Sequence, residues 1–321
     1  MLSTAIKARA RELGFDACGI APAAAHPELR FFREWLDRGY AGEMAYLNRS
    51  ADRRADVRNV LPTARTVIVT ATNYNTDRPY SIGCADPAHA QIARYAWGDD
   101  YHDVIGARME ALLAWMREHS SEPFDARSYV DTGPVQERVY AHHAGIGWIG
   151  KNTCVIHPEI GSWILLAEII CSLALQVDAP SLDRCGTCTL CLEACPTQAI
   201  VAPGVLDATR CISYLTIEKR GDIPESLHEP MGSHVYGCDV CQEVCPWNAV
   251  APRSDDGAWQ PRRAWDRVDL LTLSQRTDDE LADALRGSAM RRTKAHGLRR
   301  NVAIALRNGG KSGGHSMPKR R

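Results

Sequence analysis

Eight of the twelve cysteines lie between residues 185 and 245 and have the spacing of iron–sulfur ligands. The first run, residues 185–195, has the pattern C-x2-C-x2-C-x3-C followed by proline, in which the fourth cysteine usually binds a second [4Fe–4S] cluster. The second run, residues 238–245, is one cysteine shorter, and Cys211 supplies the missing ligand. We therefore predict two clusters, one bound by Cys185, Cys188, Cys191 and Cys245 and the other by Cys195, Cys211, Cys238 and Cys241.

Zinc is the alternative metal for sets of four cysteines, but zinc sites favour paired C-x2-C motifs over a triple run that ends in Cys-Pro. Three other cysteines, Cys18, Cys154 and Cys171, fall in apolar stretches, and we expect them to be buried small residues. A pair of clusters transfers electrons one at a time at negative potential. A simple electron carrier needs only the cysteine region, so the 184 residues that precede it need another purpose.

Three polar segments before the clusters are candidates for that purpose. Asp131 stands in the segment Asp-Thr-Gly-Pro-Val-Gln-Glu-Arg, where it either caps a helix or acts as a proton donor at a strand end. The glycine-rich residues 145–153 include Lys151 and Asn152, which would contact a bulky ligand or belong to a structural turn. His102 follows two aspartates, a position in which a structural histidine is more common than a ligand.

The elements that must position these residues alternate between helix and strand as far as about residue 175. A helix is predicted to open at Pro134 and run to about residue 144. The cysteine region is rich in turns and poor in apolar runs, which is typical of a segment held together by metal. We therefore predict an α/β or α+β sheet domain first. The other predicted helices are 3–13, 27–38, 100–119, 278–286 and 290–307, and the predicted strands are 15–21, 66–71, 128–130, 153–156 and 163–170.

Composition and charge restrict the location and the partners of the chain. Apolar residues make up 45% of it and charged residues 24%, as in soluble globular proteins. No apolar run approaches the ~20 residues that cross a bilayer, and the N-terminus lacks the apolar core of a signal peptide. We therefore expect a cytoplasmic protein without membrane contact, in which cysteines bind metal and do not form disulfides.

The C-terminal end is strongly basic. Residues 290–321 hold ten of the 38 basic residues and none of the 39 acidic ones, so the rest of the chain has a net charge of −11. This asymmetry indicates a polyanionic partner or, alternatively, a solubilising tail.

Taken together, these segments resemble the epoxyqueuosine reductase family over roughly residues 3–308. The resemblance includes the ferredoxin-type cysteines but depends mainly on more specific motifs. These motifs are Arg94-Tyr95-Ala96, Asp100-Tyr101-His102, Asp131-Thr132-Gly133-Pro134-Val135 with Glu137-Arg138, Gly147-Trp148-Ile149-Gly150-Lys151-Asn152, Cys211-Ile212-Ser213-Tyr214-Leu215-Thr216-Ile217-Glu218, and Gly237-Cys238-Asp239 with Cys241-Gln242-Glu243-Val244-Cys245-Pro246-Trp247-Asn248.

The resemblance implies a cobalamin-dependent oxidoreductase that reduces epoxyqueuosine to queuosine at the wobble position of tRNA, the last step of queuosine biosynthesis. It implies an α+β or α/β cobalamin-binding domain related to reductive dehalogenases over residues 1–178. A ferredoxin-like domain with two [4Fe–4S] clusters follows over 179–250. A short helical, HEAT-like segment over 251–310 would bind tRNA, and a flexible basic tail over 311–321 would complete the chain.

The resemblance also implies site residues. Asp131 corresponds to the family's proposed acid, and we expect burial to raise its pKa so that it carries the proton. The expected cobalamin contacts are Arg54, Asp131, Lys151, Asn152 and Ser213. The expected tRNA contacts are Lys219, Arg220, Arg291, Arg292, Lys294, Arg299 and Arg300.

The expected partners are the tRNA anticodon stem-loop and an unidentified low-potential electron donor, with the chain itself a monomer. Two other functions remain open at this point. One is a cobalamin-dependent reductase of a small molecule, resembling the reductive dehalogenases. The other is a non-catalytic electron carrier.

Overall fold

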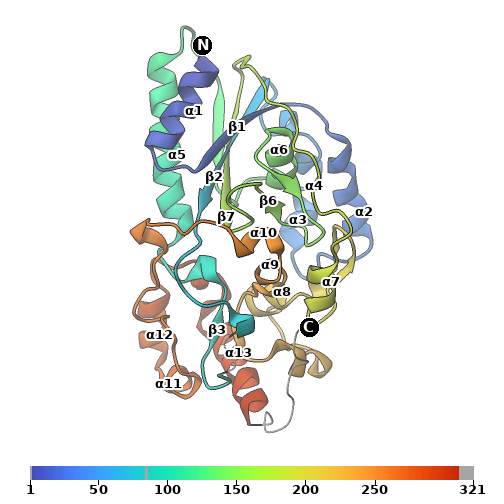
Figure 1. The fold of residues 1–321 in the computed structure, drawn as a ribbon, viewed down its shortest axis with the longest axis vertical. Coiled ribbons are helices and arrows are strands. Elements are labelled where there is room, and N and C mark those ends of the chain that lie inside the picture. Colours follow the sequence, from blue (N-terminus) through green and yellow to red (C-terminus); the bar gives the residue numbers. More distant parts are fainter. Residues whose placement is uncertain (1, 84–85, 311–321) are drawn as a thin grey trace.

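The computed structural model describes residues 2–83 and 86–310, with a four-stranded sheet of order β1-β2-β7-β4 at its centre (Figure 1). The two inner strands, β2 (Thr66–Asn73) and β7 (Ile164–Cys171), pair along eight residues each. They are flanked by β1 (Ala17–Pro22) and β4 (Ala126–Tyr129), and every pair is antiparallel. An antiparallel sheet with helices on its faces is an α+β arrangement, which confirms the predicted fold class.

Helices cover both faces of this sheet. On one face, α1 (Leu2–Glu12) and α5 (Tyr101–His119) bury Ile6, Met109 and Leu112 against the strands. On the other face, α6 (Glu137–His143) packs its apolar residues on β1, β2 and β7. The polar ends of α5 and α6 therefore meet near the end of β4, where the candidate acid lies.

Gly19 allows β1 to approach the end of α6 closely. A Cβ atom at this position would lie 2.0 Å from the carbonyl oxygen of Ala144, far inside van der Waals contact. Only glycine therefore fits between the strand and the helix. This contact fixes how α6 lies on the sheet.

Short elements complete the N-terminal part and the cluster region. The cluster region contains α7 (Leu190–Ala194), α9 (Val240–Glu243) and α10 (Pro246–Ala249), which lie below the sheet in Figure 1. Helices α7 and α9 contact each other, although they come from the two separate cysteine runs. The remaining short elements are η1 (Pro27–Arg30), α2 (Phe31–Asp37), α3 (Ala45–Arg49), α4 (Ala51–Arg54), η2 (Val57–Asn59), η3 (Ser81–Gly83), η4 (Arg94–Ala96), β5 (Trp148–Ile149), β6 (Val155–Ile156), β8 (Ile200–Ala202), β9 (Val205–Leu206), η5 (Ala208–Arg210), α8 (Ile212–Ile217), η6 (Glu225–Leu227), η7 (Glu229–Met231) and η8 (Gly257–Trp259).

The C-terminal helices share a hydrophobic core with a segment from the first half of the chain. Strand β10 (His234–Tyr236) pairs in parallel with β3 (Gln91–Ile92). Around this pair pack α11 (Leu270–Gln275), α12 (Asp278–Leu285), η9 (Ala289–Thr293) and α13 (Lys294–Gly309). Residues from the first and third predicted domains therefore meet in one core.

Most predicted elements are present, with differences at their ends. The helix predicted to open at Pro134 begins instead at Glu137, because Arg54 Nη1 donates to the Val135 carbonyl, 2.6 Å away, and the chain up to Gln136 is not helical. The helix predicted over 290–307 is a 3-10 turn followed by α13, and Lys294 has a positive φ of 61° between them.

The predicted tail, 311–321, lies outside the described residues. Among the described helices, none has the length and apolar character needed to cross a membrane.

Replacing Gly19 with alanine is expected to destabilise the protein by about 2–3 kcal/mol, because the new methyl group must displace the Ala144 carbonyl. The measurement is the thermal unfolding midpoint under anaerobic conditions, followed by circular dichroism. Gly106→Ala on α5 is the matched control, because its Cβ would meet no atom within 4 Å. It should instead stabilise by roughly 0.5–1 kcal/mol. Equal midpoints for both variants would contradict the close approach.

Candidate active site and cluster-binding region

The two cysteine runs fold against each other and form a cavity of about 150 Å³ near the surface. Residues from both runs line it. Burial and the neighbouring thiols raise the pKa of Cys191 to about 11, which shows that these groups crowd one another. Thiols in such a group are ready ligands for a metal centre, which would hold them as thiolates. The four cysteines brought together are those of the first predicted set, Cys185, Cys188, Cys191 and Cys245.

The second predicted set also converges, at a more enclosed place. Cys238 lies within electrostatic range of Cys211 and Cys195, and Cys241 lies within range of Cys238 and Cys211. Backbone amides support this group, since the Ala199 N–H donates to Cys195 Sγ at 3.2 Å. The structure therefore brings the eight cysteines together in two groups of four.

Cys154 has a contact that its apolar sequence context did not suggest. We expected it to be a buried small residue, but its thiol hydrogen-bonds to Cys241, one of the predicted ligands. Trp148 makes a comparable contact, because its indole N–H donates to Cys185 Sγ at 3.4 Å. Both come from the glycine-rich segment 145–154, which therefore supports both cysteine groups.

Three of the predicted cobalamin contacts also hold the cysteine segments. The Lys151 ammonium donates to the carbonyls of Gly186 and Cys188, at 2.7 and 2.8 Å. The Asn152 amide, in a residue only 4% exposed, donates to the Cys241 carbonyl. Ser213 hydrogen-bonds to Cys211 at the start of α8.

Asp131 lies just after β4, in a backbone conformation that is unusual for an aspartate. Its φ is +58°, in the left-handed region. Its amide N–H donates to Glu137 Oε1 at 2.8 Å, which ties this turn to the start of α6. The side chain is 62% exposed and accepts a hydrogen bond of 3.1 Å from the Tyr101 hydroxyl. Asp131 is therefore a fixed carboxylate that faces solvent.

His102 connects Asp131 to a second aspartate. Its Nδ1 lies 2.7 Å from Asp100 Oδ1 and its Nε2 lies 3.6 Å from Asp131 Oδ2. Burial acts to lower the pKa of His102, but the two carboxylates outweigh it and raise the pKa to about 9. His102 is therefore protonated at neutral pH and lies between two acids.

The expectation of a raised pKa at Asp131 is wrong for this structure. The surrounding protein does act to raise it. The hydrogen bonds from His102 and Tyr101, with the charges of His102 and Arg138, outweigh that effect and lower the pKa of Asp131. The proton therefore resides on His102, and Asp131 is ionised.

Two neighbouring carboxyl groups have the raised values instead. Burial and the nearby Asp131 charge raise the pKa of Glu137 to about 7. Glu168, fully buried on β7, lies against Glu137, and burial with this like charge raises its pKa well above the ordinary range. Glu168 was missed from the sequence, although a glutamate inside the apolar run 163–170 was a usable signal.

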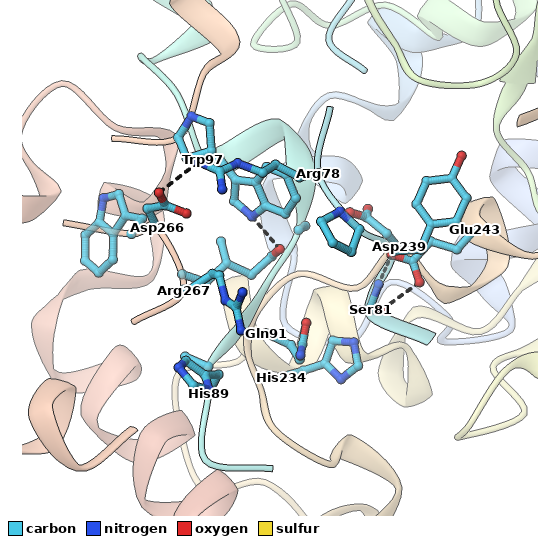
Figure 2. A pocket seen from close by; sticks show the side chains of 17 residues that line it. Arg78, Ser81, His89, Gln91, Trp97, His234, Asp239, Glu243, Asp266 and Arg267 are labelled. Carbon is cyan, nitrogen blue, oxygen red and sulfur yellow. Dashed lines mark hydrogen bonds and ion pairs between the residues drawn. The ribbon is translucent and has the colours of Figure 1, made fainter. Parts of the chain in front are cut away.

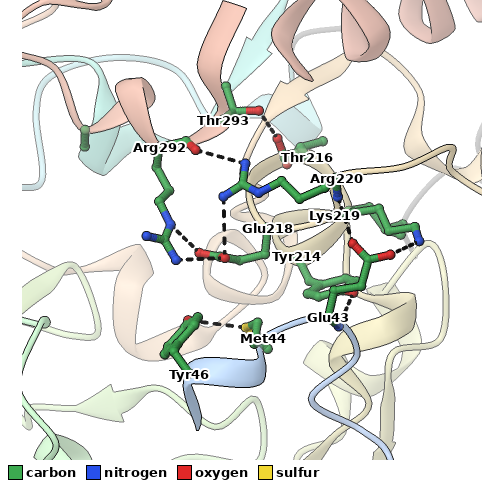
Figure 3. A network of polar contacts seen from close by, with 12 residues as sticks. Glu43, Met44, Tyr46, Tyr214, Thr216, Glu218, Lys219, Arg220, Arg292 and Thr293 are labelled. Carbon is green, nitrogen blue, oxygen red and sulfur yellow. Dashed lines mark hydrogen bonds and ion pairs between the residues drawn. The ribbon is translucent and has the colours of Figure 1, made fainter. Parts of the chain in front are cut away.

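A polar network contains several predicted tRNA contacts (Figure 3). Tyr46 and Arg292 of this network lie within electrostatic range of Asp131. Arg292 forms two hydrogen bonds with the Glu218 carboxylate, at 2.8 and 2.9 Å, and its guanidinium lies over the Tyr46 ring. Lys219 forms an ion pair with Glu43. The Arg220 guanidinium lies 3.9 Å from Glu218 and donates to the Arg292 carbonyl.

The other predicted tRNA contacts have two different environments. Arg300 donates to the carbonyls of Leu215, Lys219 and Gly221, so it caps the end of α8. Arg299 pairs with Asp278 at 2.7 Å. Arg291 and Lys294 are exposed, and neither forms an ion pair within the described part of the chain.

The lining of a cavity of about 110 Å³ includes two carboxylates, Asp239 and Glu243, from α9 and the residue before it (Figure 2). On one side of it, Glu243 of α9 accepts hydrogen bonds from the Ser81 amide and hydroxyl. Asp239 accepts from the Arg94 amide, and burial raises the pKa of Asp239 to about 7. These carboxylates fix α9 to the segment 81–94.

Comparison with known families gives two matches along the chain. Residues 54–132 match the family described as epoxyqueuosine reductase QueG, DUF1730. Residues 184–248 match the 4Fe-4S double cluster binding domain, the region in which the cysteines converge.

Curated relatives and solved structures are similar over nearly the whole chain. An epoxyqueuosine reductase of Gloeobacter violaceus is 46% identical over 314 residues, which cover 96% of each chain. One of Synechocystis sp. is 43% identical and covers 85% of this chain and 93% of the relative. A crystal structure of an epoxyqueuosine reductase with an epoxyqueuosine-modified tRNA-Tyr stem loop superposes with a TM-score of 0.87 at 29% identity. It covers 97% of this chain and 82% of the other. The enzyme from Streptococcus thermophilus gives 0.83 at 29% identity and covers 95% and 80%.

Replacing His102 with asparagine should destabilise the protein in a pH-dependent way. Because the pKa of His102 is raised from its ordinary value near 6.5 to about 9, its stabilising contribution is complete below about pH 6.5 and disappears as the pH rises through about 9. The measurement is the difference in thermal midpoint between wild type and variant at pH 6 and pH 9.5, and the difference should shrink at the higher pH. His119→Asn, an exposed residue on the same helix, is the control. A difference that stays constant with pH would show that the ion pairs of His102 do not contribute to the stability of the protein.

Proposed function

Since this chain belongs to the epoxyqueuosine reductase family, we propose that it reduces epoxyqueuosine to queuosine at the wobble position of a tRNA anticodon. This would be the last step of queuosine biosynthesis. The observation that carries the proposal is an exposed carboxylate, Asp131, held by Tyr101 and the protonated His102. Arg138 lies within electrostatic range of this carboxylate and of Cys154, which contacts the double-cluster region. The reaction takes up two electrons and two protons and releases the epoxide oxygen as water.

We assign two [4Fe–4S] clusters to the two cysteine groups. Cys185, Cys188, Cys191 and Cys245 would bind the outer cluster, which lies in the surface cavity. Cys195, Cys211, Cys238 and Cys241 would bind the inner one, whose ligands are more enclosed. Electrons would enter from an unidentified low-potential donor at the outer cluster and leave from the inner one, because the outer cluster is closer to solvent.

We propose cobalamin as the third cofactor, located beside Asp131. The fit rests on the residues there: the Tyr46 ring is exposed at 37%, and Arg54 lies within electrostatic range of Asp131. An exposed ring, a guanidinium and a carboxylate suit a large macrocycle with amide arms. When bound, cobalamin supplies a strongly reducing cobalt centre for breaking the carbon–oxygen bond. The residues proposed to hold it are Arg54, Asp131, Lys151, Asn152 and Ser213.

The side chains around Asp131 would supply the protons. His102 holds one at Nε2, 3.6 Å from Asp131 Oδ2, while Asp100 fixes the ring through Nδ1. Asp131 would pass this proton to the departing oxygen, which is a poor leaving group without it. Glu137, with a pKa of about 7, is a second proton store next to the same turn.

The basic residues near this site would bind the tRNA backbone. Arg291 and Lys294 are the strongest candidates, because they are exposed and free of ion pairs among the described residues. Arg220, Arg292 and Lys219 would have to exchange a carboxylate partner for a phosphate. Arg299 and Arg300 have structural partners and are weaker candidates. We further propose that the protein acts as a cytoplasmic monomer.

Replacing Asp131 with asparagine should lower the rate of epoxyqueuosine reduction by at least about 10²-fold, because the proton path to the oxygen is lost. Asparagine tolerates the left-handed backbone, so the fold should persist. The measurement is conversion of epoxyqueuosine-containing tRNA with cobalamin and a reductant, followed by nucleoside mass spectrometry.

The control for this variant is Asp103→Asn, an exposed aspartate one residue after His102. Both variants should keep wild-type iron content, and Asp131→Asn should still bind cobalamin, because the four other proposed contacts remain. Full activity of Asp131→Asn would remove this residue from the mechanism, whereas wild-type activity that does not depend on tRNA would favour a small-molecule reductase.

The double variant Arg291→Ala, Lys294→Ala should bind tRNA more weakly and with a smaller salt dependence. Each lost phosphate contact reduces the slope of log affinity against log salt by about 1, so a decrease of about 2 is expected. The measurement is tRNA affinity at several salt concentrations. Arg307→Ala, at the far end of α13, is the control and should change neither quantity. An unchanged slope in the double variant would place tRNA elsewhere.

A further inference from the structure

A group of histidines and one glutamate includes neither the predicted cluster ligands nor Asp131. Glu28 comes from η1, and His142 and His143 form the end of α6. The potential ligand atoms of these three side chains all lie within 4.8 Å of one another. Two imidazoles and a carboxylate are a donor set that zinc and similar ions bind in proteins.

His142 is oriented as a ligand. Its Nδ1 is buried and has no hydrogen-bond partner among the described residues. The Gly147 carbonyl lies within range of the same ring. The unsatisfied Nδ1 is therefore the ring atom that is available to bind an ion.

His143 and Glu28 face each other at the same place. His143 Nε2 lies 3.1 Å from Glu28 Oε2, close to the distance of about 3.3 Å between two ligands of a tetrahedral ion with bonds of about 2.0–2.1 Å. His26 stacks on the His143 ring, with centroids 3.6 Å apart and planes at 12°. The His26 ring is itself fixed by a contact of 3.2 Å between Nε2 and the Pro22 carbonyl.

We propose that Glu28, His142 and His143 bind one divalent first-row transition ion of the zinc class, through a carboxylate oxygen, Nδ1 and Nε2 respectively. Water would complete a tetrahedral site. On binding, the ion takes the place of the contact between His143 Nε2 and Glu28 Oε2, and the ring hydrogen of His143 is then on Nδ1. The proposal does not depend on the proposed reaction, because its ligands take no part in it.

A bound ion would connect η1 to the C-terminal end of α6. Glu137, at the N-terminal end of the same helix, accepts a hydrogen bond from the Asp131 amide. The ion would thus stabilise the helix that positions the candidate acid.

The test is zinc binding to the anaerobically purified, cluster-containing protein, dialysed against buffered zinc, with zinc and iron measured together by mass spectrometry. Wild type should bind one zinc per chain without loss of iron, since a loss of iron would indicate zinc in the cysteine sites. Glu28→Gln and His142→Ala should each reduce zinc affinity roughly tenfold or more, and His119→Ala should not.

Glu28→Gln keeps the test decisive if His142→Ala folds poorly, because the Glu28 side chain is 42% exposed and the substitution is nearly isosteric. Zinc should also raise the thermal midpoint of wild type but not of Glu28→Gln. Wild type that binds no more zinc than the two variants, or that binds zinc only at the expense of iron, would overturn the proposal.

Discussion

The hydrogen bond from the Asp131 amide to the Glu137 carboxylate is the contact on which the candidate site depends most. A non-glycine residue with φ near +58° is strained unless its surroundings hold it in place. Glu137 does so from the first turn of α6, and it lies between the Asp131 turn and the buried Glu168. Neither carboxylate oxygen of Glu168 has a hydrogen-bond partner among the described residues. Removal of Glu137 would release the turn, so the position of the candidate acid depends on Glu137.

The cysteine region depends on the sheet domain in a comparable way. Lys151 and Asn152 donate to carbonyl groups in both cysteine segments, and Glu243 of α9 is bound by the segment that begins at Ser81. Metal ligation alone would close the two cysteine groups but would not set their direction relative to Asp131. These polar contacts do set it, since each one joins the cluster region to the part of the chain that carries the acid. The proposed routes of electrons and protons thus share one set of connected elements.

Local sequence patterns predicted more of this protein than the distant contacts did. The spacing of the cysteines predicted which of them lie together, because ligand geometry is local. The β-branched run at 66–71 predicted β2, because burial in a sheet selects such residues. The pKa of Asp131 was not predictable, because it depends on His102, 29 residues away along the chain. Arg300 looked like a phosphate contact by charge alone, yet it caps α8. Charge and composition indicate what a residue can bind, and only the fold shows which partner it has.

The pairing of β3 with β10 has a consequence for how the chain is made. Gln91 and Ile92 find their strand partner only after residues 234–236 have been synthesised. At typical translation rates of about 5–20 residues per second, the delay is roughly 7–30 s. During that interval the apolar residues around Ile92 and Ala96 lack the core in which they end. The first cysteine run and Cys211 emerge within this interval, and the second run follows directly after residue 236. Binding of metal by the cysteines and closure of this core would therefore occur at about the same time. Nascent chains of this protein should therefore depend on chaperone protection more than a chain whose domains close one after another.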